Sequence, residues 1–175
     1  MITLYQPSDK GFGQKDYEQY YKDAISSCNF YEVSCSCKMK GHFIKHGYYS
    51  RNVKTPVGYI YLHILRIRCK HCGRTHAILP SFVVPYSRHL LEDHIRIAKA
   101  TLEAEPYLDI MEDNPYIDPG NINYIKKKFI QHWKERIRSI SLSLMTATAS
   151  IIRSCFLSFN RQFMQIRRGW NSLYY

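Results

Sequence analysis

The sequence predicts an α+β protein in which a small zinc-ribbon β module precedes a helical, helix-turn-helix-like domain. Two cysteine pairs, Cys35-x-Cys37 and Cys69-x-x-Cys72, stand at the two ends of a stretch rich in aromatic and β-branched residues. Apolar residues at helical spacing follow that stretch. The 175 residues allow one ordinary domain or two small ones. The predicted division is an N-terminal helical segment at 1–32, a zinc ribbon at 33–86, a helical domain at 87–160 and a basic aromatic tail at 161–175.

The segment 14–27 (QKDYEQYYKDAISS) predicts a short amphipathic helix that covers one side of the β module. Its apolar face is expected to carry Tyr17, Tyr20 or Tyr21, Ala24 and Ile25. The first residues have neither an apolar core nor a leading positive cluster, so no secretory signal is expected. Six cysteines without such a signal favour a reducing, cytoplasmic location.

Three strands are predicted between and beyond the cysteine pairs. Phe43–Arg51 and Tyr59–Arg68 are joined through a turn signal at Thr55–Gly58 (TPVG). Thr75–Leu79 follows the second pair, and an extended linker, SFVV at 81–84, comes after it. One face of the second strand is expected to carry Ile60, Leu62, Ile64, Arg66 and Arg68.

The four paired cysteines are predicted to hold one structural zinc ion. Zinc binds thiolates in a tetrahedron, and a closed four-thiolate site leaves no position for a catalytic water. Gly73, directly after the second pair, suits a tight turn. Because the first pair is one residue shorter than the common spacing, His42 or His71 is an alternative ligand, and buried free thiols are the other interpretation. Cys28 and Cys155 lie outside the pattern.

The helical region begins with Ser87 as a predicted N-cap, and its first apolar repeat is Leu91, Ile95, Ala98 and Leu102. A short helix at Tyr107–Asp113 follows. Asp118-Pro119 then predicts a third helix, with Asp as N-cap and Pro at the first position. Its apolar face is expected to carry Ile122, Ile125, Phe129, Trp133 and Ile137.

The order helix, short helix, turn, helix is compatible with a helix-turn-helix arrangement. The apolar repeat continues as far as Cys155. The sequence therefore allows either one very long helix or a break near Ser139–Ser143.

The charge distribution indicates an anionic partner. The chain carries a formal charge of +11, and Val33–Leu91 holds 10 Lys/Arg and no Asp or Glu. Residues 119–175 form a second basic block beyond an acidic belt at 89–118. The predicted nucleic-acid contacts are Lys45, Tyr48, Arg51, Lys54, Arg66, Arg68 and Arg74 on the β module, and Asn121, Asn123, Lys126, Lys127, Lys128 and Arg136 on the third helix.

These residue types suit nucleic acid because Lys and Arg neutralise phosphates and Tyr stacks on bases. Early residues of a recognition helix reach base edges, and Asn pairs with adenine. The alternative interpretation is that the cations form ordinary solvated faces and that the tyrosines fill a small core.

Two segments resemble a family of uncharacterised small bacterial proteins related to the N-terminal regions of transposases. They are HGYYSR (His46–Arg51) and RIRCKHCGRTHAILPSFVVPYS (Arg66–Ser87), and RQFMQIRR (Arg161–Arg168) is similar to the same family. In that family a zinc ribbon precedes a helix-turn-helix. The resemblance implies DNA binding linked to a mobile element, with zinc ligands Cys35, Cys37, Cys69 and Cys72.

The expected function is a zinc-containing DNA-binding regulator or accessory factor that is not an enzyme. The sequence has no Gly-rich phosphate loop and no nucleophile elbow. The two basic blocks contribute only Glu135 toward the carboxylates of a metal-dependent nuclease. Ile137–Phe159 is too polar for a membrane span, so no membrane partner is expected. Double-stranded DNA is the expected partner; the alternatives are a protein partner, or RNA stacked on Tyr48, Tyr49, Tyr59 and Tyr61.

Overall fold

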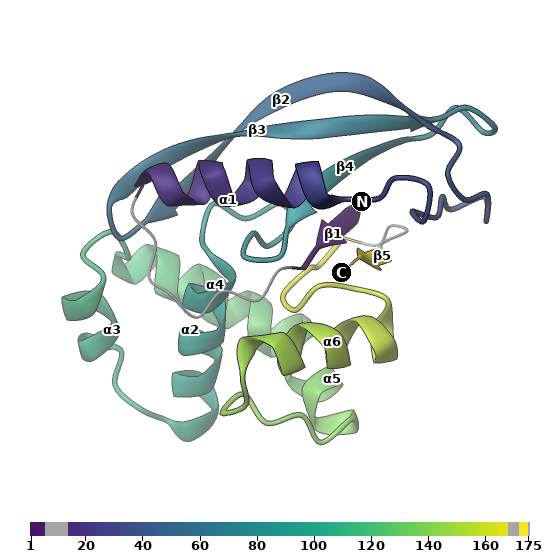
Figure 1. Cartoon of the computed structure of the whole chain (residues 1–175). Helices are drawn as coiled ribbons and strands as arrows, with labels where there is room; N and C mark the ends of the chain where they lie inside the picture. Colours follow the sequence, from purple (N-terminus) through teal and green to yellow (C-terminus); the bar gives the residue numbers. More distant parts are fainter. Residues whose placement is uncertain (6–13, 168–171, 175) are drawn as a thin grey trace.

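A computed structural model describes residues 1–5, 14–167 and 172–174, and it confirms the α+β class. The strands are β1 (Ile2–Leu4), β2 (Phe43–Thr55), β3 (Gly58–Cys69), β4 (Thr75–Pro80) and β5 (Ser172–Tyr174). The helices of the described residues are α1 (Gln14–Ser27), α2 (Leu91–Glu103), α3 (Leu108–Asp113), α4 (Pro119–His132), α5 (Lys134–Ser139) and α6 (Thr148–Phe159). Figure 1 shows β2 and β3 as an upper layer, with α1 beneath them and α2 to α6 below.

The strands form one sheet in the order β2-β3-β4-β1-β5. The short strand β1 pairs in parallel with β4 on one side and with β5 on the other. The two ends of the chain therefore meet in the sheet (Figure 1). Residues 1–32, predicted as a helical segment, supply a strand as well as α1.

The antiparallel pair β2–β3 is a long ribbon, because β3 pairs with β4 only over Arg66–Arg68. Two-stranded ribbons twist strongly, and a bulge before Gly47 increases the twist. The buried face of β3 changes along the ribbon: Ile64 and Leu65 are both fully buried. Beyond them Ile67 is buried and Arg66 is exposed. The residues predicted to share one face of β3 follow strand alternation. The buried face of the strand, however, changes halfway from the side of Ile64 to the side of Leu65 and Ile67.

The helix α1 packs along the underside of the ribbon, as predicted, with Tyr17, Tyr21 and Ala24 buried. The Tyr21 hydroxyl donates a hydrogen bond to the Ile78 carbonyl (2.8 Å) and accepts one from the Leu65 amide (2.9 Å). It thus satisfies one backbone group on each of β3 and β4 where these strands separate.

The helices α2 and α4 share a second core with α6 and the C-terminal segment. Asp118 caps α4 as predicted, accepting a hydrogen bond from the Asn121 amide (2.7 Å). The five predicted apolar positions of this region are all buried. The structure has the break rather than one long helix: α4 ends at His132, and residues 140–147 separate α5 from α6.

Ser87 is not the N-cap of α2, which begins at Leu91. The Asp93 carboxylate accepts a hydrogen bond from the Leu90 amide (3.1 Å) and so holds the first turn. The predicted extended linker 81–84 is instead a turn with a single bridge between Val83 and Leu90. The segment 81–84 turns because Val83 is buried in the core between the ribbon and α1, whereas Val84 is buried in the helical core.

The predicted tail is part of the packed structure over 161–167. Phe163 is fully buried, and the Gln162 side chain donates a hydrogen bond to the Ser81 carbonyl. Arg168 lies outside the described residues. Across the described ranges, no helix has the length and apolar character that crossing a bilayer requires.

Candidate metal centre and nucleic-acid surface

The two cysteine pairs come together at the end of the ribbon remote from the hairpin turn. Ligand atoms of Cys35, Cys37, Cys69 and Cys72 all lie within 4.8 Å of one another. The Cys35 and Cys72 sulfurs are 3.5 Å apart, and those of Cys37 and Cys69 are 3.8 Å apart. Cys35 and Cys69 are buried and the other two are partly exposed. This four-cysteine cluster is compatible with a structural metal ion such as zinc.

Tight turns aim the sulfurs of each pair toward one point. In the first pair the Lys38 amide donates to the Cys35 carbonyl (2.9 Å), and Lys38 has a positive φ of 69°. In the second pair the Gly73 amide donates to the Cys69 carbonyl (2.9 Å), with a φ of 73° at Gly73. The short spacing of the first pair is therefore accommodated by a left-handed residue directly after it.

His76 contacts the cluster although the sequence pointed to other histidines. Its Nε2 lies 3.3 Å from the Cys35 sulfur, and its ring is buried edge-on against Phe43. Burial opposes ionisation of Cys35, but hydrogen bonds from the Cys37 amide and from His76 help to lower the Cys35 pKa to about 5. Neither His42 nor His71 belongs to the ligand cluster of the described residues.

The ribbon exposes its tyrosines, so the interpretation that they fill a small core is wrong. Tyr48, Tyr59 and Tyr61 are 58%, 54% and 56% exposed, and Tyr49 is 36% exposed. The ribbon side chains that β2 and β3 hold inside are aliphatic, such as Val53, Ile60 and Leu62. Five of the predicted nucleic-acid contacts on the β module are exposed: Lys45, Tyr48, Arg66, Arg68 and Arg74.

Two predicted contacts on the ribbon are instead held within the fold. Arg51 donates to the backbone carbonyls of Val84 (2.6 Å) and Ser87 (2.7 Å), and burial lowers its pKa. Lys54 donates to the Asn121 side chain (3.0 Å) and lies near the Asp118 carboxylate (4.0 Å). These cations join the ribbon to the 84–87 turn and to α4, so Arg51, Lys54 and Asn121 have structural contacts, and their contact with nucleic acid stays a prediction.

The remaining predicted residues of α4 and α5 divide into two groups. Asn123 and Lys127 are exposed. The others lie over aromatic rings: Lys126 over Tyr107 (5.3 Å), Lys128 over Tyr124 (5.8 Å) and Arg136 over Trp133 (5.2 Å). Cations stacked on rings keep their charge but give up part of their freedom to reach a ligand.

Sequence reasoning missed His76 as a partner of the cluster and the pairing of Ser87 with His94 (2.8 Å). The signal for His76 was its position, four residues after Cys72 at the start of a predicted strand. No comparable signal marks His94, which lies inside an amphipathic helix.

One domain family matches the chain: a domain of unknown function (DUF6431) matches residues 34–114. The matched stretch contains both cysteine pairs, the whole ribbon, β4, α2 and α3, and it ends before α4. Neither a curated protein nor a solved structure matches the chain. The comparison therefore assigns no activity, and it groups the cysteine cluster and the ribbon within one domain.

Proposed function

We propose that the chain is a zinc-containing DNA-binding protein, related to the DNA-binding part of transposases and acting as a regulator or accessory factor without nuclease activity. The observation that carries the proposal is the set of exposed cations and tyrosines on the ribbon, here called the ribbon surface: Lys45, Tyr48, Tyr49, Tyr59, Tyr61, Arg66 and Arg68. Arg66 and Arg68 project from the face of β3 opposite to Tyr59 and Tyr61, so the ribbon surface extends over both faces. No carboxylate lies between Val33 and Leu91 to offset its charge. The four-cysteine cluster holds the end of the ribbon beside this surface.

Zinc is the proposed ion because the cluster has its preferred ligands and spacing. Zn–S bonds of about 2.3 Å in a tetrahedron place neighbouring sulfurs about 3.8 Å apart. Two of the six sulfur–sulfur separations, 3.5 and 3.8 Å, are close to that edge, and all of them lie within 4.8 Å. Four thiolates close the coordination shell, so the ion would be structural and would stabilise the two turns.

His76 gives the first prediction, because a hydrogen bond to a ligating sulfur orients the ligand. Replacing His76 by phenylalanine keeps the packing against Phe43 and removes the Nε2 contact. We expect zinc affinity to fall about 10- to 100-fold, measured by competition with a chromophoric chelator. The control is His71→Phe, between the second pair of cysteines and exposed. A loss confined to the His71 variant would contradict the role given to His76.

Duplex DNA is the proposed partner because a two-stranded ribbon fits the major groove. Arg66 and Arg68 project from β3 next to the cluster, and Lys45 projects from β2. Asn123 and Lys127 of α4 add an exposed amide and a cation on the helical side. In the helix-turn-helix interpretation α2, α3 and α4 form the three helices, and the Asn121 side-chain oxygen accepts a hydrogen bond from Lys54, which restricts its use in base reading.

Removal of three ribbon cations tests this proposal. Each lost phosphate contact lowers the slope of log K against log salt by about 0.9. The variant Lys45→Gln/Arg66→Gln/Arg68→Gln should therefore reduce the slope for a duplex by almost three if each cation meets one phosphate. Fluorescence anisotropy in increasing KCl measures it.

The control Lys22→Gln/Arg138→Gln/Arg153→Gln removes the same charge from exposed helix positions. It should keep most of the wild-type slope. Equal slopes for the two triple variants, or flat binding of the wild type across low and moderate salt, would contradict the ribbon surface as the contact.

Unpaired nucleic acid is a second candidate, favoured by the four exposed tyrosines. Stacking of a base on an aromatic ring contributes about 1–3 kcal/mol and needs an unpaired base. The variant Tyr48→Ala/Tyr61→Ala should weaken binding to single-stranded RNA much more than binding to duplex DNA if stacking dominates. A larger loss of binding to duplex DNA than to single-stranded RNA favours duplex DNA as the partner.

A further inference from the structure

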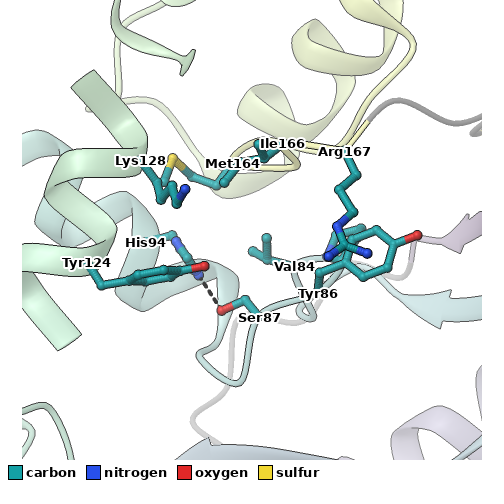
Figure 2. Close-up of a pocket in the computed structure, with 10 residues that line it drawn as sticks. Val84, Tyr86, Ser87, His94, Tyr124, Lys128, Met164, Ile166 and Arg167 are labelled. Carbon is teal, nitrogen blue, oxygen red and sulfur yellow. Dashed lines mark hydrogen bonds between the residues drawn. The ribbon is translucent and has the colours of Figure 1, made fainter. Parts of the chain in front are cut away.

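A pocket of about 200 Å³ lies between the turn at 84–87, the helices α2 and α4 and the C-terminal segment. Figure 2 shows His94, Tyr124 and Lys128 on one side of it, and Tyr86 and Arg167 on the other. None of the residues that line this pocket belongs to the ribbon surface. Its lining residues come from segments that lie far apart in the sequence, and the packing of 161–167 against α4 supplies one wall of it.

The charge of the pocket is positive. Lys128 and Arg167 line it, and no described lining residue is a carboxylate. Lys128 lies 5.8 Å from the centre of the Tyr124 ring, and Arg167 lies 4.9 Å from the centre of the Tyr86 ring. In the described part of the chain neither cation has an ion pair. Two cations held at opposite walls by aromatic rings favour an anionic ligand.

His94 adds a buried polar group with an unused nitrogen. The residue is 3% exposed, its Nε2 lies 2.8 Å from the Ser87 hydroxyl, and its Nδ1 has no hydrogen-bond partner among the described residues. The Ser87 oxygen accepts a hydrogen bond from the His89 amide (3.0 Å), and a hydroxyl can accept a second hydrogen bond as well as donate one, so either tautomer of His94 satisfies the Ser87 contact. In the tautomer in which Ser87 donates to Nε2, Nδ1 carries the proton and is a donor without an acceptor among the described residues.

His94 does not itself add charge. Burial lowers its pKa to about 3, so the ring is neutral near pH 7. A neutral N–H donor between two cations, with the Tyr124 hydroxyl directed toward the pocket (Figure 2), is complementary to oxygens that only accept hydrogen bonds.

We propose that this pocket binds the phosphate group of a nucleotide. Lys128 and Arg167 would neutralise the phosphate from the two walls, and the buried histidine would donate to one of its oxygens. A single phosphate leaves part of the pocket free, and the tyrosine rings suit a base or sugar there. The phosphate could belong to a free mononucleotide or to the end of a strand.

Calorimetric titration of the full chain with inorganic phosphate, in a low-chloride buffer near pH 7, tests the proposal. The wild type should bind with a Kd of about 1 mM or tighter. Lys128→Gln and Arg167→Gln should each weaken binding about tenfold, the usual effect of one charge-assisted hydrogen bond. Lys128→Arg keeps the charge and should retain most of the affinity, and circular dichroism checks that each variant is folded.

The matched control is Arg153→Gln, an exposed cation of α6 that belongs to no proposed site, which should bind phosphate like the wild type. An equal loss in the Arg153 and Lys128 variants would overturn the site, because it would indicate a diffuse effect of charge. No binding up to about 10 mM phosphate would overturn it as well.

Two further ligands distinguish the source of the phosphate. An adenosine monophosphate titration tests a free nucleotide, and a pair of short DNA strands with and without a 5′-phosphate tests a strand end. Tighter binding of the phosphorylated strand than of the mononucleotide assigns the pocket to nucleic-acid ends. The triple variant of the ribbon cations should leave inorganic phosphate binding unchanged, so failure of the pocket and failure of the ribbon surface are separable.

Discussion

The variant Cys69→Ser/Cys72→Ser is expected to lose its metal and the structure of the knuckle end of the ribbon. Serine hydroxyls are poor zinc ligands at neutral pH, and structural zinc contributes about 10–16 kcal/mol of apparent binding free energy in small zinc domains. Elemental analysis should show one zinc ion per wild-type chain and a background level in the variant. Hydrogen exchange should show lost protection at 33–45 and 66–76.

The effect should stay local, because the helical core is separate. The buried residues of α2, α4 and α6 form a cluster that contains none of the four cysteines. Their amides should remain protected in the variant. Cys28→Ser is the control for the loss of a thiol: Cys28 is buried beside α1, outside the cluster, and this variant should keep its zinc. Full metal content and wild-type exchange in the double variant would contradict the assignment.

The second large effect is expected at Trp133, the largest fully buried side chain of the described residues. Its ring meets Phe159 and Phe163 edge-on, at 5.9 and 5.3 Å between ring centres. Its Nε1 donates to the Gln165 carbonyl (3.2 Å). Trp133→Ala should lower the free energy of unfolding by about 3–5 kcal/mol, measured by urea denaturation.

The matched control is Ile130→Ala on α4, three residues before Trp133, at a position 45% exposed. It should change the free energy of unfolding by about 0.5 kcal/mol or less. If Trp133→Ala cost no more than this control, the C-terminal segment would not pack on α4. The phosphate pocket, of which that packing supplies one wall, would then be lost too.

The sequence predicted the features that short segments determine. The helix α1 followed from its apolar stripe, and the start of α4 followed from Asp118-Pro119, because both signals lie within a few residues. The meeting of the cysteine pairs was also predictable, since thiols at the two ends of a hairpin-sized segment are brought together when it pairs. The three-residue strands β1 and β5 were not, because their pairing partners come from opposite ends of the chain.

The availability of charged side chains was the hardest property to predict. Arg51 looks like any other cation of the ribbon, yet it binds carbonyls more than 30 residues away at Val84 and Ser87. The burial switch at Ile64–Leu65 likewise depends on twist and on Tyr21, which lies 44 residues before Leu65. The sequence around Arg51 does not indicate the carbonyls that it contacts, and the sequence around Leu65 does not indicate Tyr21. Position in a basic block is therefore a weak guide to contact with a ligand.

X-ray absorption at the zinc edge of the purified full chain tests the central claim most directly. The account predicts one zinc ion per chain with four sulfur neighbours at about 2.3 Å. A chain that binds no metal, or a zinc ion surrounded by nitrogen and oxygen, would contradict it.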